Sequence, residues 1–158
     1  MTATMSATSD RTDRAQDGLI ARATAALVPY APSILRVIVG VVFFVYGTNK
    51  LASPEGFAGF VGSLGFPAPE FLGWLVIGLE IIGGAALVVG LLVRPIALLF
   101  LAEMTVTTLL VKFDRGIGPA DGSGMEIDLV LWGAAAVLAI LGAGRLSVDR
   151  DVIGRDLV

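Results

Sequence analysis

The chain has 158 residues, of which 56% are hydrophobic and 16% charged, and its mean hydropathy is +0.87. These values are typical of an integral membrane protein. The net charge of −3 comes without a basic run, which excludes nucleic acid as a partner. Cysteine and histidine are absent, so dithiol redox chemistry, thiolate or histidine metal sites and histidine acid–base catalysis are excluded for this chain.

Residues 1–32 are predicted to precede the membrane domain. Residues 1–18 are mostly small and polar, a composition that does not bury enough surface to fold, and a flexible tail is expected. In residues 19–28 apolar side chains recur at helical spacing, which predicts a short helix on the membrane surface. Pro29 and Pro32 are expected to end that helix.

Four apolar segments predict an all-α bundle of four transmembrane helices. The predicted spans are residues 33–51, 71–93, 95–112 and 126–143, followed by a C-terminal tail at 144–158. Between the first two spans, Ser53, Pro54 and Glu55 are typical of a helix start. The segment is too short to cross a bilayer, so we expect an interfacial helix in this first outer loop.

The positive charges predict the orientation in the membrane. Lys50, Lys112 and Arg115 lie at one end of the predicted bundle, and more cations lie at the other, namely Arg11, Arg14, Arg22, Arg94, Arg145, Arg150 and Arg155. Because positive charge accumulates on the cytoplasmic side, both termini are expected in the cytoplasm. The predicted location is the cytoplasmic membrane, with several passes through the lipid bilayer.

Glu80 and Glu103 each lie near the middle of a predicted span. A carboxylate at that depth costs about 2.5 to 3.5 kcal/mol on insertion scales, so both are expected to face the bundle interior. At about 1.5 Å per residue, both lie roughly 12 to 14 Å below the same membrane face. The two carboxyl groups are therefore predicted to share one layer of the bundle.

Arg36, about one turn inside the cytoplasmic boundary, is the predicted partner of Glu80 or Glu103. If one carboxylate is ionised beside Arg36, the second is expected to keep its proton, because desolvation and like charge both disfavour another negative charge. Two interpretations stay open: a proton- or ligand-handling centre, and a network that only fixes helix register. On the outer side, snorkelling to the surface or local ion pairs, rather than a site, are expected for Lys50, Lys112, Glu126 and Asp128.

The chain resembles the DoxX family of small four-helix membrane proteins. Four patterns between residues 33 and 149 carry the resemblance: R-x3-G-x6-G-x2-K at 36–50, GFPAP at 65–69, E-x2-GG with a later glycine at 80–90, and G-x-G-R-L-S-V-D at 142–149. The resemblance implies a membrane redox connection. The family's namesake is associated with a thiosulfate:quinone oxidoreductase, and a mycobacterial member is linked to superoxide dismutase and a sulfurtransferase.

The resemblance thus implies a subunit that anchors protein partners of a redox complex and holds a quinone, with no covalently bound cofactor. A quinone needs an apolar slot with a proton acceptor and a donor. Glu80 and Glu103 are the candidate proton-handling residues, Arg36 would fix the charge of one, and Tyr46 or Trp74 would pack against a ring. The missing cysteines and histidines argue against a complete oxidoreductase in this chain alone.

Two other functions stay open from the sequence. Glycines such as Gly40 and Gly47 in the first span and Gly83 and Gly84 in the second let helices approach closely, which is typical of a non-catalytic scaffold or assembly protein. Carboxylates in the middle of a membrane also suit a small proton-coupled transporter. Against a transporter, no inverted repeat is visible and four short spans leave little room for a gated path.

Overall fold

The computed structural model describes residues 21–22, 24–118 and 124–149, and every regular element in these ranges is a helix. Three helical segments there are long and apolar enough to cross a membrane, namely Thr24–Leu51, Pro69–Val89 and Val93–Arg115. The chain is therefore an all-α, multi-pass membrane protein. The flexible tail expected at residues 1–18 and the last nine residues of the C-terminal tail lie outside the described ranges.

The first membrane-capable segment is one continuous helical path. It passes through the 3-10 turn η1 (Val28–Tyr30) into α2 (Ala31–Leu51). Pro29 and Pro32 are the second residues of η1 and α2, within the first turn, where the missing proline N–H leaves no hydrogen bond unmade. The structure therefore differs from the break that these prolines predict.

A short helix, α3 (Pro54–Ser63), follows α2 and packs against α4 (Pro69–Gly78). Pro54 and Glu55 occupy its first turn, as the local sequence predicts. Its placement on the membrane surface stays a prediction.

The second membrane-capable segment contains an irregular turn. It runs through α4, the π-helical turn η2 (Leu79–Gly83) and α5 (Gly84–Val89). The chain then reverses at Gly90, whose φ of +81° is a left-handed conformation that glycine adopts without strain. The reversal lies at residues 90–92, a few residues before the boundary predicted between the spans 71–93 and 95–112.

The third segment consists of α6 (Val93–Thr107), a second π-helical turn η3 (Thr108–Lys112) and the 3-10 turn η4 (Phe113–Arg115). The last helix, α7 (Glu126–Leu141), packs along α6. Its 16 residues give a length of about 24 Å, somewhat less than the roughly 30 Å of a hydrocarbon core. A fourth membrane crossing by α7 stays a prediction.

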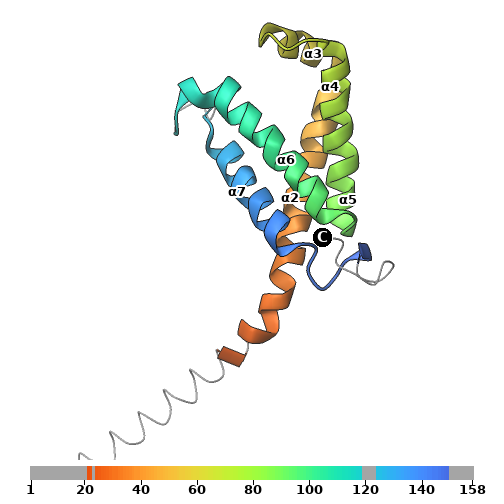
Figure 1. Cartoon of the computed structure of the whole chain (residues 1–158), viewed down its shortest axis with the longest axis vertical. Coiled ribbons are helices and arrows are strands. Elements are labelled where there is room, and N and C mark those ends of the chain that lie inside the picture. The colour runs from red at the N-terminus through yellow and green to blue at the C-terminus, as the bar shows by residue number, and fades with distance from the viewer. Residues whose placement is uncertain (1–20, 23, 119–123, 150–158) are drawn as a thin grey trace, which may run out of the picture.

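The helices form two groups, α2 with α4–α5 and α6 with α7 (Figure 1). The groups converge where α5 ends and α6 begins, which we call the base, and diverge toward the opposite end, which carries α3 and which we call the α3 end. Phe43 of α2 and Phe100 of α6 join the groups: both are 0% exposed and their rings stack with centroids 3.6 Å apart. The apolar core therefore lies on the base side of the bundle.

Glycines fix the register of α2 against the second segment. A Cβ atom on Gly84 would lie 2.7 Å from the carbonyl oxygen of Gly40, and one on Gly47 would lie 2.9 Å from the Cβ of Glu80. Such close backbone approach requires small residues on the contact face. The Gly40–Gly84 contact therefore sets which residue of α2 stands beside Glu80.

Candidate functional site

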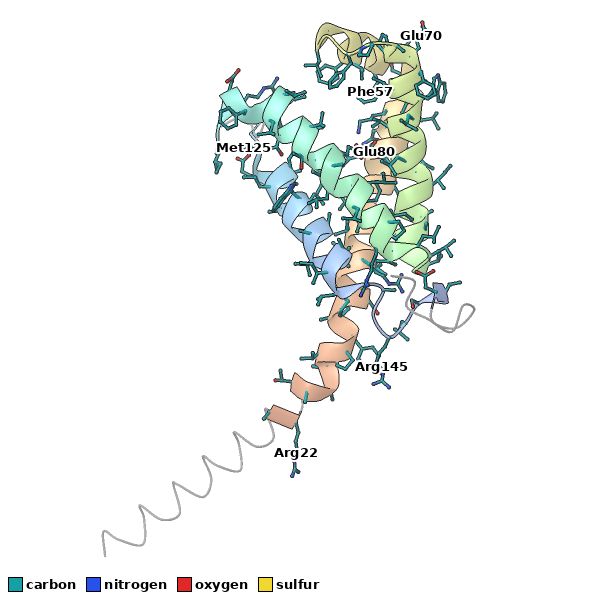
Figure 2. The ribbon with its side chains drawn as sticks, in the orientation of Figure 1. Arg22, Phe57, Glu70, Glu80, Met125 and Arg145 are labelled. Atoms are coloured by element: carbon teal, nitrogen blue, oxygen red, sulfur yellow. The ribbon has the colours of Figure 1, made fainter. Side chains whose placement is uncertain are left out.

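Glu80 lies in the π-helical turn η2 and is only 1% exposed. Its Oε1 atom is paired with the ammonium of Lys50, which reaches inward from the last turn of α2. The Lys50 ammonium also stands 6.0 Å from the ring centroid of Tyr46 and 5.2 Å from that of Phe57. The sequence predicts Lys50 outside the centre, whereas in the structure Lys50 is the cation of the buried glutamate. Figure 2 marks Glu80 inside the bundle.

Glu103 of α6 is the second carboxyl group of the centre. Its side chain interacts with that of Glu80 across the two helix groups, and Lys50 lies close enough to attract both. The Oε2 atoms of Glu80 and Glu103 are both buried without a hydrogen-bond donor among the described residues. The structure thus brings together the two glutamates that the sequence predicts in one layer.

A second ion pair continues this polar layer toward α7. Lys112 of η3 donates to Oδ1 of Asp128 at 2.8 Å, and Asp128 lies near enough to Glu103 to act on its charge. The other oxygen of Asp128 and the hydroxyl of Thr108 are buried and unpartnered among the described residues. We call this set the polar layer; its members are Lys50, Glu80, Glu103, Thr108, Lys112 and Asp128.

Arg36 takes no part in the polar layer, which corrects the predicted pairing with a glutamate. Its guanidinium donates to the carbonyl oxygens of Leu87 and Val88, both at 2.6 Å, of Ala143 at 3.0 Å, and of Leu146. The physical reason is register: Arg36 lies one turn before Gly40, so it reaches the end of α5 rather than η2. Arg36 therefore ties the C-terminal segment to the base.

Asp149 completes this attachment at the base. Its carboxylate accepts from the backbone N–H groups of Leu92 at 3.0 Å and Val93 at 3.3 Å, where α6 begins. Its own N–H donates to the carbonyl of Gly90 at 3.1 Å. A carboxylate at a helix N-terminus is stabilised by the unpaired N–H groups there. The closing G-x-G-R-L-S-V-D pattern is thus structural in this fold.

Trp74 lies apart from the polar layer. Its side chain is 56% exposed and lines a groove between the end of α2, α3 and α4. Tyr46, in contrast, is partly buried against the core and adjoins Lys50. Of the two rings proposed to contact a ligand, only Tyr46 is beside the polar layer.

The sequence patterns did not reveal the role of Lys50 or either of the π-helical turns. A π turn inserts one residue into a helix and re-aims its side chains, and such turns are frequent at functional sites. Here one contains Glu80 and the other contains Thr108 and Lys112. The sequence signal that could have identified Lys50 is its spacing from Gly47, three residues earlier on the same face.

A multi-pass helical bundle with a buried layer of charged side chains defines this chain as a membrane protein with a polar intramembrane centre. Residues 31–113 match the DoxX family, and the chain belongs to that family. This confirms the resemblance seen in its motifs. No solved structure matches the chain.

Three relatives share about three quarters of the chain. "Putative oxidoreductase CatD" of Bacillus subtilis is 34% identical over 73% of this chain and 82% of its own length. "Inner membrane protein YphA" of Escherichia coli is 28% identical over 74% of this chain and 86% of its own length. "Inner membrane protein YqjF" of the same bacterium is 32% identical over 74% of this chain and 88% of its own length. These names describe the relatives and not this chain.

Proposed function

We propose that the chain is an accessory subunit of a redox assembly in the cytoplasmic membrane, and that its polar layer holds and exchanges a proton beside a quinone. The observation that carries the proposal is the buried group of Lys50, Glu80 and Glu103, with a free oxygen on each carboxyl. The name of the Bacillus subtilis relative supports a redox setting, and those of the two Escherichia coli relatives support the location. In this proposal α7 is the fourth span and both termini are cytoplasmic.

Charge balance argues for a proton in the polar layer. It contains two ammonium groups, Lys50 and Lys112, and three carboxyl groups, Glu80, Glu103 and Asp128. An uncompensated negative charge is strongly disfavoured in a buried site. One proton shared by Glu80 and Glu103 balances the charges and gives a donor to the two unpartnered Oε2 atoms.

The donor set fits a quinone. A quinone brings two carbonyl oxygens and takes up protons with electrons, so it needs hydrogen-bond donors in an apolar surrounding. The Lys50 ammonium and the shared proton of the glutamates are such donors, and Tyr46 is the adjoining ring. Arg36 is not part of this proposal, because four backbone carbonyls hold its guanidinium.

The test is Glu80→Gln in native membranes, with quinone-dependent reduction measured on the purified assembly. Removal of a positioned acid–base group is expected to lower the rate by about a hundredfold. Glu70→Gln, at an exposed carboxyl in the first turn of α4, is the matched control and should leave the rate unchanged. A wild-type rate in Glu80→Gln at equal abundance would remove the proposed role.

The glycine contacts favour a second candidate function, a non-catalytic scaffold for assembly. Gly40, Gly47 and Gly84 lie in close backbone contacts within the chain. On this alternative the polar layer specifies only how the helices pair. Glu80→Gln would then lower the amount of assembled complex and leave the rate per complex unchanged.

A further inference from the structure

The polar layer is asymmetrically placed between the two ends of the bundle. On the base side, one turn before Gly47 and one turn before Glu103, lie the stacked rings of Phe43 and Phe100, both 0% exposed. Leu87 and Leu138 are also 0% exposed and belong to the same core. Close-packed apolar side chains of this kind leave no room for a chain of water molecules. The base side of the layer is therefore sealed.

Toward the α3 end, polar groups continue from the layer to the surface. The side chains of Lys50 and Lys112, at the ends of α2 and η3, are each 27% exposed. Asp128, in the first turn of α7, pairs with Lys112 and lies near enough to Glu103 to act on its charge. Five elements each contribute a charged group to the layer: α2, η2, α6, η3 and α7.

Four of the five unpartnered buried side-chain atoms among the described residues lie in the polar layer; the fifth, Nε of Arg94, lies at the base, at the start of α6. Beyond the two glutamates, Thr108 Oγ1 and Asp128 Oδ2 have no hydrogen-bond partner among the described residues, and both side chains are more than nine-tenths buried. Buried polar atoms of native proteins are ordinarily satisfied by protein groups or ordered water. A line of such atoms from Glu103 to the surface is what a hydrated connection requires.

We propose that the Glu80–Glu103 pair exchanges protons with water only at the α3 end, through a hydrated path past Thr108 and Asp128. The proton moves between a carboxyl oxygen of Glu103 and water, with no change of oxidation state. Lys112 positions Asp128 along this path through their ion pair. The inference rests on the proposed proton-handling role and adds the side from which the protons come.

The chain has no cysteine, so single cysteines report access directly. Thr108→Cys is the test position. Ser63→Cys, exposed on α3, marks the α3 end, and Thr24→Cys, exposed before η1, marks the base. Leu138→Cys, fully buried in the core, is the matched buried control. The probe is a small charged, membrane-impermeant methanethiosulfonate applied to either side of sealed vesicles.

Thr108→Cys is expected to react from the side on which Ser63→Cys reacts, at least about tenfold faster than from the Thr24 side, because thiol reactivity follows access to water. Leu138→Cys is expected to resist the reagent from both sides. Equal labelling of Thr108→Cys from both sides, labelling from the Thr24 side alone, or no labelling would overturn the proposal. Asp128→Cys gives the same test if Thr108→Cys does not yield a monodisperse protein. The labelling assay contains no quinone and no redox partner, so its result is independent of the proposed redox role.

Discussion

Lys50 of α2 forms an ion pair with Glu80 of η2, one helical turn beyond the point where Gly47 meets the second segment. Lys50 can reach Glu80 because Gly47 has no side chain to hold the two helices apart. The pair therefore depends on helix packing as much as on charge.

Lys50→Met should destabilise the protein more than the double variant Lys50→Met/Glu80→Gln. Removal of one partner of a buried ion pair leaves the other group either uncompensated or forced to take up a proton and typically costs about 3 to 5 kcal/mol, whereas neutral replacement of both avoids that penalty. The measurement is the midpoint of thermal unfolding in mild detergent. A double variant whose loss equals the sum of the two single losses would show that the residues do not interact.

Gly84→Ala should disrupt the packing of α2 on α5. The added methyl group would lie 2.7 Å from the carbonyl oxygen of Gly40 and 2.7 Å from the N–H nitrogen of Phe44, which are backbone atoms that cannot move aside cheaply. Overpacking of this kind costs about 1 to 3 kcal/mol. Thermal unfolding in the same detergent measures the loss.

Gly133→Ala is the matched control for that substitution. Gly133 lies inside α7 with nothing within 4 Å of an added Cβ, so alanine should be neutral or stabilising by up to about 1 kcal/mol. Equal effects of Gly84→Ala and Gly133→Ala would contradict the close contact between α2 and α5.

Arg36→Lys should release the C-terminal segment from the base and leave the Lys50–Glu80 pair intact. Lysine lacks the planar set of donors with which the guanidinium reaches Leu87, Ala143 and Leu146. Hydrogen exchange of residues 143–149 should accelerate, and exchange of the Val93 N–H should follow as Asp149 loses its position.

The control for Arg36→Lys is Arg145→Gln. Arg145 is exposed. Among the described interactions it makes only a ring contact, in which its guanidinium carbon lies 5.5 Å from the ring centroid of Tyr30. Its loss should hardly change exchange in the same segment. Unchanged exchange in Arg36→Lys would mean that the guanidinium does not hold this segment.

Helix periodicity and membrane depth were sufficient to predict the all-α class and the shared depth of Glu80 and Glu103, and the four sequence patterns indicated the family. They were insufficient to identify the cation that pairs with Glu80. Depth counting places Arg36 near the glutamates but does not give the register of α2 against the second segment. The Gly40–Gly84 contact fixes that register, and with it Lys50 reaches Glu80. Both π turns also escaped prediction, since one inserted residue leaves no distinct mark in an apolar sequence.

The central claim, one proton shared by Glu80 and Glu103, is tested most directly by infrared spectroscopy of the purified protein at neutral pH. We expect a carboxylic acid C=O band that shifts in heavy water and that disappears or moves in both Glu80→Gln and Glu103→Gln. We expect the band to grow in Lys50→Met, because without the ammonium both carboxyl groups keep a proton. Absence of such a band in the wild-type protein, or its persistence unchanged in both glutamine variants, would contradict the account.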